Sequence, residues 1–166
     1  MSVIIATDGS CIGNPGPGAY AFVASFGGQI VRRAIPSKAT TVGEMEVRGL
    51  LEALLFVFDQ KLWEQGPIVI RCDSQYVVNG FNDWMAGWQA KGWHKKGGLA
   101  HAELWKRIAA AKADIASVAP GADISVRWVR AHQTDGCRWN AMVDALANLT
   151  ARNQQAVNAP SLQDGQ

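Results

Sequence analysis

Two short apolar runs in this 166-residue chain are each followed at once by an aspartate. Residues 3–7 (VIIAT) precede Asp8, and residues 68–72 (IVIRC) precede Asp73. Both runs have the length and the β-branched composition of buried strands. Between them, apolar residues recur at helical spacing from Val47 to Phe58. A strand, a helix and a second strand in this order predict a crossover connection within one sheet, with Asp8 and Asp73 at the same end of two strands.

The remaining apolar runs and helical spacings predict an α/β fold with a five-stranded sheet and helices on the faces of the sheet. Two close turns, one of them Gly27-Gly28, favour an antiparallel meander of the first three strands. We predict strands at residues 3–7, 19–26, 29–35, 68–72 and 124–129, helices at 43–60, 102–118 and 138–152, and one or two short helices at 74–90. Residues 1–152 are expected to form one domain, followed by a flexible polar tail at 153–166.

Composition limits the function classes only weakly. The net charge of +2 does not by itself indicate a nucleic-acid-binding protein, so any such signal must come from local clusters. The three cysteines lack metal-site spacing and suggest no disulfide framework, which fits a reducing compartment. Because no apolar run approaches the roughly 18 residues of a membrane span, we expect a soluble protein without membrane contact. We also expect it to be cytoplasmic and monomeric.

Four acidic residues stand among apolar or small neighbours: Asp8, Glu46, Asp73 and Asp144. A carboxylate in such surroundings is unfavourable unless it is paired or bound to a metal ion. Ligands of open α/β sheets bind at the carboxyl ends of the strands, where Asp8 and Asp73 are expected. Several acids gathered there would repel each other, and Mg²⁺, which prefers oxygen ligands, would relieve that repulsion.

Each acid taken alone also has an ordinary explanation. Asp8 before Gly9 fits a turn, and Asp73-Ser74 fits the start of a helix. Glu46 and Asp144 fit partly exposed positions on helices. The four acids together, in this order around one predicted sheet, favour a metal site.

Five blocks of the sequence, from about Val3 to Arg152, resemble type 1 ribonuclease H. They are TDGSCIGNPGPGAY, MEVRGLLEAL, CDSQYVVNGFNDWMAGWQAKGW, ELWKRI and VRWVRAHQTDGCRWNAMVDALA. The resemblance implies a ribonuclease H-like fold with a mixed five-stranded sheet in the order 3-2-1-4-5. It also implies an endonuclease that hydrolyses the RNA strand of RNA–DNA hybrids, leaving 5′-phosphate and 3′-hydroxyl ends.

The resemblance assigns roles to individual residues. It places two Mg²⁺ ions, or Mn²⁺, on Asp8, Glu46, Asp73 and Asp144, and it puts His132 in a flexible loop that assists proton transfer or product release. The other residues that it implicates would contact the hybrid: Cys11, Asn14, Thr41, Gln75, Trp84, Lys91, Lys95, Lys96 and Asn140. Trp84, Trp88 and Trp105, at helical spacings, are also explained as core residues, and this explanation is favoured for Trp88 and Trp105.

The chain departs from the family pattern just before Glu46. Val42, Gly43 and Glu44 stand where the family usually has two asparagines and an arginine, so we expect restored asparagines at 42 and 43 to tighten hybrid binding. Ala131 replaces a glycine before His132, and His101 stands near a position that is often asparagine. Two alternatives therefore remain open: a catalytically weak or silent hybrid- or duplex-binding module, and a nuclease of this fold with an altered substrate.

Overall fold

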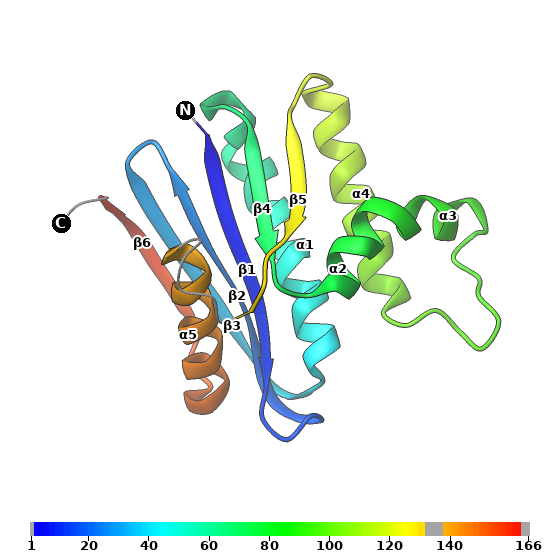
Figure 1. The fold of residues 1–166 in the computed structure, drawn as a ribbon, viewed down its shortest axis with the longest axis horizontal. Coiled ribbons are helices and arrows are strands. Elements are labelled where there is room, and N and C mark those ends of the chain that lie inside the picture. The colour runs from blue at the N-terminus through cyan, green and yellow to red at the C-terminus, as the bar shows by residue number, and fades with distance from the viewer. Residues whose placement is uncertain (1, 132–137, 164–166) are drawn as a thin grey trace.

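The computed structural model describes residues 2–131 and 138–163. A mixed sheet forms the centre, with helices on both faces (Figure 1). Its strands are β1 (Val3–Cys11), β2 (Gly16–Phe26), β3 (Gln29–Thr40), β4 (Ile68–Cys72), β5 (Ile124–Trp128) and β6 (Val157–Gln163). The helices are α1 (Val42–Gln60), η1 (Leu62–Gln65), α2 (Gln75–Asn79), η2 (Gly80–Trp84), α3 (Met85–Ala90), α4 (Ala102–Val118) and α5 (Arg138–Asn153).

The strand order is β5-β4-β1-β2-β3-β6. β1 pairs antiparallel with β2, and β2 pairs antiparallel with β3. β4 runs parallel to β1, and β5 runs parallel to β4, because the long connections through α1 and α4 cross over the sheet. The predicted order 3-2-1-4-5 and the α/β class are confirmed.

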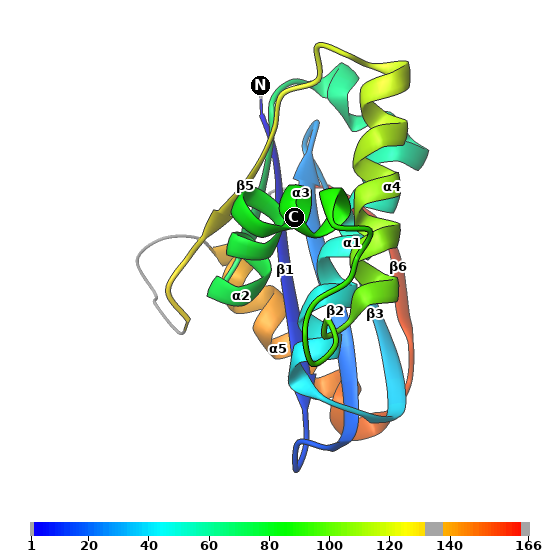
Figure 2. The ribbon, with the colours of Figure 1, turned by 90° about the vertical axis from the view of Figure 1, so that its right-hand side faces the viewer.

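Two apolar clusters lie on opposite faces of the sheet. Ile5 packs in the larger cluster with residues of α1 and α4, whereas its neighbour Ala6 packs in the smaller one with Trp139 and Val143 of α5. Successive strand residues point to opposite faces, so β1 contributes to both cores. Figures 1 and 2 show the result, with α5 on one side of the sheet and α1 and α4 on the other. No helix in the described ranges is long and apolar enough to cross a membrane.

The first three strands are longer than predicted. β1 continues to Cys11, so Asp8 lies within the strand and pairs with Ala21 of β2, rather than standing at the end of the strand. The glycines after Asp8 suggested a turn, but the antiparallel pairing with β2 keeps this part of the chain extended. The break in the β1–β4 pairing still falls at Asp8, because the last paired residues are Thr7 and Cys72.

The prediction of five strands was wrong by one strand. β6 lies in the segment predicted to be a flexible tail and pairs antiparallel with β3, with Ala34 opposite Val157 and Ile30 opposite Leu162. The segment has no apolar alternation that would have indicated a strand. Pairing requires only backbone groups, and the outer edge of β3 offers a row of them.

A chain that ends at Gln155 should be less stable but still fold, because it loses the pairing of β6 with β3 and the packing of Val157 on the smaller apolar cluster, while the rest of both cores stays. Each backbone hydrogen bond contributes a net ~1 kcal/mol, so we expect the free energy of unfolding to fall by on the order of 2 kcal/mol. Urea denaturation measures the loss, and a chain that ends at Gln163, which keeps β6, is the control. Equal stability of the two chains would contradict a stabilising role for β6.

Candidate active site

Three carboxylates from three separate elements line one pocket. Asp8 lies within β1, Asp73 follows β4 directly, and Asp144 lies on α5, which packs against β1 and β2. Their common pocket has a volume of about 220 Å³. The other residues of its lining are Thr7, Val129, Arg130, Ala131, Asn140, Ala141 and Val143. The structure thus brings together three of the four acids that the sequence singled out.

Asp8 is the most deeply buried of these acids, with 6% of its surface exposed. Burial raises its pKa to about 9, and the charge of Asp73 adds to the increase. The backbone N–H of Gly9 donates a hydrogen bond of 2.8 Å to Oδ1 of Asp8 and opposes the increase, whereas the contact with Asp144 reinforces it. The protein therefore holds this carboxyl where a negative charge is unfavourable unless a positive charge joins it.

Glu46 reaches the same region from α1, although it does not line the pocket. Its pKa is raised by burial and by the charge of Asp73, while a hydrogen bond from the Ser74 side chain lowers it. Ser74 also begins α2, because its Oγ accepts a hydrogen bond of 3.3 Å from the backbone N–H of Val77. One buried hydroxyl therefore links Glu46 to the segment that carries Asp73.

Gly9 allows β1 and α1 to approach closely beside Asp8. A Cβ on Gly9 would lie 2.5 Å from the carbonyl carbon of Met45 and would also collide with the backbone nitrogen of Glu46. Real Cβ atoms essentially never approach backbone atoms so closely. Because Gly9 has no side chain, β1, which carries Asp8, can lie close to α1, which carries Glu46.

Gly9→Ala should push α1 away from β1 and move Glu46 away from Asp73. Overpacking of this kind costs about 1–3 kcal/mol, so thermal unfolding should occur at a lower temperature. The rate at which the protein cleaves an RNA–DNA hybrid should decrease by a larger factor than the fraction of folded protein. Gly121→Ala, at a glycine with open space around it, is the control. A Gly9→Ala protein with normal stability and activity would contradict the close packing.

Two residues that the sequence analysis missed hold Asp144 and its surroundings. Nδ2 of Asn148 donates to Oδ1 of Asp144 at 3.3 Å, and Oγ of Ser10 donates to Oδ1 of Asn148 at 2.6 Å. Asn148 lies four residues after Asp144, one helical turn away, so the helical spacing could have indicated this contact. Ser10 comes from β1, and no sequence spacing indicates that partner.

The donor set fits a hard divalent cation. All four candidate ligands are carboxylates, which Mg²⁺ prefers. The burial of Asp8 beside acidic neighbours makes its negative charge unfavourable, and a bound cation would compensate for it. Among residues 2–131 and 138–163, no three His, Cys, Asp or Glu side chains are grouped closely enough to form a ready metal site. Asp8, Asp73 and Asp144 line one pocket, and Glu46 lies close enough to Asp73 for the charge of Asp73 to raise its pKa.

The predicted loop histidine, His132, lies outside the described residues. The described chain reaches the rim of the pocket at Ala131, one residue before it. On the other side of the gap, Asn140 of α5 also lines the pocket. Its Oδ1 is buried and has no hydrogen-bond partner among the described residues, so it is available to a ligand.

The predicted phosphate-holding residues lie together where α1 begins. Oδ1 of Asn14 accepts a hydrogen bond of 3.0 Å from the backbone N–H of Val42, and Oγ1 of Thr41 accepts one of 3.3 Å from the N–H of Glu44. The Sγ of Cys11, half-buried, lies 3.3 Å from the carbonyl oxygen of Thr40. The contacts of Asn14 and Cys11 join the β1–β2 loop and the end of β1 to the segment where α1 begins.

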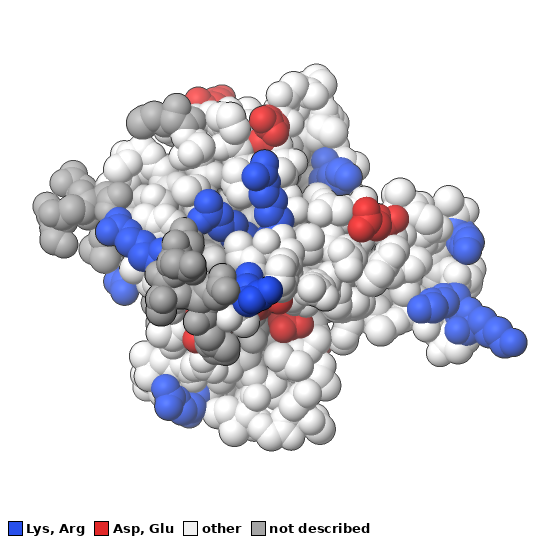
Figure 3. All heavy atoms as spheres, in the orientation of Figure 1, with Lys and Arg blue, Asp and Glu red and all other residues white. Residues whose placement is uncertain are grey.

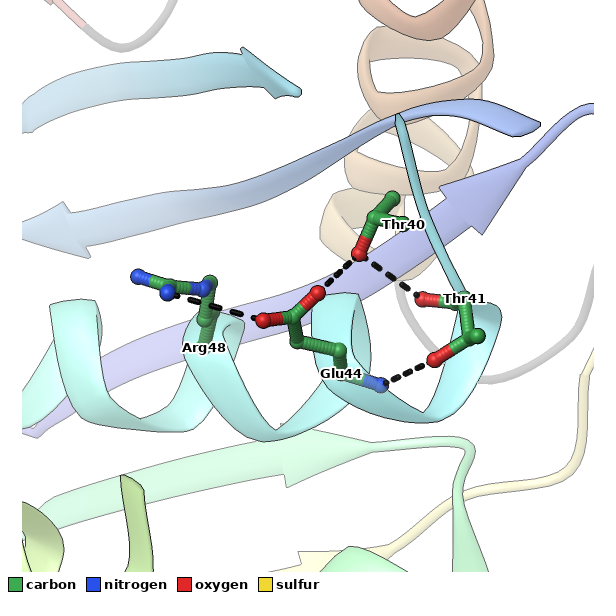
Figure 4. A network of polar contacts seen from close by, with 4 residues as sticks. All are labelled: Thr40, Thr41, Glu44 and Arg48. Atoms are coloured by element: carbon green, nitrogen blue, oxygen red, sulfur yellow. Dashed lines mark hydrogen bonds and ion pairs between the residues drawn. The ribbon is translucent and has the colours of Figure 1, made fainter. Parts of the chain in front are cut away.

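Glu44 does not leave an unpaired negative charge near this loop. Its carboxylate accepts a hydrogen bond from Oγ1 of Thr40 and forms an ion pair of 3.6 Å with Arg48 (Figure 4). Glu44 and Arg48 are four residues apart, so they share one face of α1. Glu44 is therefore part of a polar network that joins the end of β3 to α1.

The other candidate contacts lie on the projecting side of the molecule. Gln75 begins α2 and is exposed, and Trp84 at the end of η2 is 43% exposed. Trp105 is completely buried, and Trp88 is half-buried and packs against the same apolar core. Lys91, Lys95 and Lys96 are exposed on the segment between α3 and α4, and Figure 3 shows Lys and Arg side chains on that projection.

Comparisons with known proteins identify the family of this chain. A family model described as RNase H matches residues 1–152. A ribonuclease H from Xanthomonas campestris pv. campestris (strain 8004) is 36% identical over 162 residues, which is 96% of this chain and 99% of the relative.

Two solved structures have the same fold. LC9-RNase H1, a type 1 RNase H with the type 2 active-site motif, is 28% identical with a TM-score of 0.73, covering 99% of this chain and 78% of the other. LC11-RNase H1, solved in complex with an RNA/DNA hybrid, is 23% identical with a TM-score of 0.65 over 92% of this chain and 98% of the other, and it supports the fold alone. On the family match and the sequence identity together, this chain belongs to the RNase H family.

Proposed function

We propose that this protein is a ribonuclease H that hydrolyses the RNA strand of RNA–DNA hybrids and leaves 5′-phosphate and 3′-hydroxyl ends. The observation that carries the proposal is the convergence of Asp8, Asp73 and Asp144 on one pocket at the β1–β4 junction. Membership of the family and the 36% identical ribonuclease H support the same activity.

Asp8, Glu46, Asp73 and Asp144 would hold the metal ions, with Mg²⁺ or Mn²⁺ as the candidates. When bound, two such ions supply the positive charge that activates a water and stabilises the departing oxygen in phosphodiester hydrolysis. Ser74 holds Glu46 beside Asp73, and Asn148 holds the carboxylate of Asp144. The amide oxygen of Asn140, which has no hydrogen-bond partner among the described residues, would accept a hydrogen bond from a group in the pocket.

The remaining candidate residues would bind the substrate. Asn14 and Thr41 would hold a phosphate of the DNA strand, with Cys11 beside them, and Gln75 would contact the shallow minor groove. Trp84 offers an exposed ring for stacking or sugar contact, and the lysines of the projecting segment offer salt-sensitive phosphate contacts. His132 is assigned to proton transfer or product release, since imidazole titrates near neutrality.

We further propose that residues 1–152 carry the activity, that the protein acts as a monomer, and that it works in the cytoplasm. The matched range of the family model supports the first of these proposals. The chain that ends at Gln155 tests it directly, because it should keep its turnover per folded molecule while it loses stability.

A panel of matched duplexes tests the proposed function. Wild-type protein with Mg²⁺ should cut the RNA strand of an RNA–DNA hybrid and leave double-stranded RNA, double-stranded DNA and single-stranded RNA intact. Hybrid binding without cleavage would replace the proposal by a silent binding module. Preferred cleavage of another duplex would mean a nuclease of the same fold with an altered substrate.

A further inference from the structure

Two arginines stand side by side on neighbouring strands of the sheet. Arg71 of β4 is the register partner of Arg127 of β5, and the two strands run in the same direction. Neighbouring strands lie roughly 4.8 Å apart, so both side chains leave the same face of the sheet next to each other. Like charges in such positions repel each other and destabilise a sheet. The arrangement is therefore unfavourable unless an anion lies beside the two guanidinium groups.

The face of the sheet that carries this pair is not covered by a helix. Ala6, the register partner of Arg71 on β1, packs in the smaller apolar cluster, so Arg71 lies on the α5 side of the sheet. α5 itself packs on β1, β2 and β3, and in Figure 1 no helix of the described ranges crosses in front of β4 and β5. Arg71 is half-buried and Arg127 is exposed. Within the described part of the chain, neither of them forms an ion pair.

A third arginine connects this pair to the catalytic pocket. Arg130 follows β5, is exposed, and lines the pocket together with Asp8 and Asp73. We call Arg71, Arg127 and Arg130 the arginine strip. Figure 3, in the orientation of Figure 1, shows Lys and Arg side chains on this face of the molecule close to acidic ones. The strip therefore leads from the pocket onto the open face of β4 and β5.

We propose that the arginine strip binds the phosphates of the RNA strand where that strand leaves the catalytic pocket. This inference rests on the proposed function and adds a binding surface to it. A guanidinium group is planar and donates paired hydrogen bonds, which match the oxygens of a phosphate group. Phosphates beside Arg71 and Arg127 would compensate the mutual repulsion of the two positive charges.

The dimensions of the strip fit a strand that continues from the pocket. Asp73 follows Arg71 by two residues, and a β-strand rises roughly 3.3 Å per residue, so Arg71 lies roughly 7 Å from Asp73 along the chain. One strand of a duplex rises roughly 3.4 Å per phosphate along the axis. With one phosphate at the pocket, the phosphate about two nucleotides further along the same strand would therefore come within reach of Arg71 and Arg127.

Arg71→Gln and Arg127→Gln test the strip, because each removes one positive charge. Each variant should raise KM for the hybrid on the order of fivefold at physiological ionic strength, with kcat unchanged within about twofold. The slope of log KM against log NaCl concentration should become shallower by roughly 1 in each single variant and by roughly 2 in the double variant. Steady-state cleavage of the hybrid at a series of NaCl concentrations measures both quantities.

The thermal stability of the same variants separates binding from a structural role. Removal of either charge relieves the repulsion within the pair, so the free protein should unfold at the wild-type temperature or above it. Arg71→Lys keeps the positive charge and should keep the wild-type salt slope. If Arg71→Gln and Arg127→Gln instead unfold at a lower temperature and keep the wild-type KM and slope, the arginines have a structural role and the proposal is overturned.

Arg152→Gln is the matched control for the change in net charge. Arg152 is an exposed arginine in the last turn of α5 and lies outside both the strip and the pocket. This variant should keep the wild-type KM and salt slope. If it loses as much of the slope as Arg71→Gln does, the effect comes from net charge alone, and the strip is not a binding surface.

The proposed function and the role of the strip fail separately. If wild-type protein cuts the hybrid and the double variant Arg71→Gln/Arg127→Gln has the wild-type KM and salt slope, the role of the strip is refuted and the proposed function stands. If wild-type protein does not cut the hybrid at all, the proposed function fails first, and the inference about the strip fails with it.

Discussion

Asp73→Asn should abolish metal-dependent cleavage of the hybrid while the protein stays folded. The substitution keeps the shape of the side chain but removes one of the negative charges around the pocket. The backbone at position 73 should hold its place, because Nε1 of Trp128 donates to the carbonyl oxygen of Asp73 at 3.1 Å. We expect turnover to fall on the order of 10³-fold, as it does when an essential electrostatic group of an active site is lost.

Asp59→Asn is the matched control for this prediction, since Asp59 is an exposed aspartate at the end of α1 and outside the pocket. It should cleave at the wild-type rate. Circular dichroism and thermal unfolding establish that both variants are folded. Near-normal turnover of Asp73→Asn would show that the acids of this pocket do not carry the chemistry.

Asp8→Asn should abolish cleavage in the same way but stabilise the metal-free protein. Asp8 is almost completely buried beside Asp73 and Asp144, so its ionisation is unfavourable in the folded state. An asparagine can still accept the hydrogen bond from Gly9, and its amide can donate to the neighbouring carboxylates. In EDTA near pH 8 we expect the free energy of unfolding to rise by about 1–3 kcal/mol.

The sign of this effect follows from the raised pKa of Asp8. Its pKa is about 9 in the folded protein, against 3.8 ordinarily, so the folded state binds more protons between these values. Stability from this group is therefore complete below about pH 4 and is lost as the pH rises toward about 9. Urea denaturation in EDTA should show wild type losing stability from about pH 5 to about pH 8, and Asp8→Asn losing less. Parallel curves for the two proteins would contradict the burial of an unfavourable charge.

The sequence was most informative where one physical signal dominated. The runs that end at Thr7 and Cys72 were apolar enough to be recognised as strands, and the spacing from Val47 to Phe58 indicated α1. Their order predicted the crossover, and the crossover placed Asp8 and Asp73 side by side. The sequence analysis predicted that acids far apart in the chain would gather, and Asp8, Asp73 and Asp144 do line one pocket.

The sequence was least informative where contacts between distant segments decide the structure. β6 has no regular alternation of apolar residues and pairs with β3 through its backbone, so no side-chain pattern indicated the strand. Gly9 looked like a turn residue, yet it lies inside β1 and permits the approach of α1. A contact between Gly43 and His101 joins α1 to α4, and local spacing carries no information about it.

A crystal soaked in MnCl₂ and measured at the manganese absorption edge tests the central claim most directly. The claim is that Asp8, Asp73 and Asp144, with Glu46 nearby, gather divalent cations in one pocket. The expected result is an anomalous peak within coordination distance of Asp8 and Asp73, absent from crystals of Asp73→Asn soaked in parallel. Wild-type crystals with no peak in this pocket, or with manganese bound only elsewhere, would contradict the account.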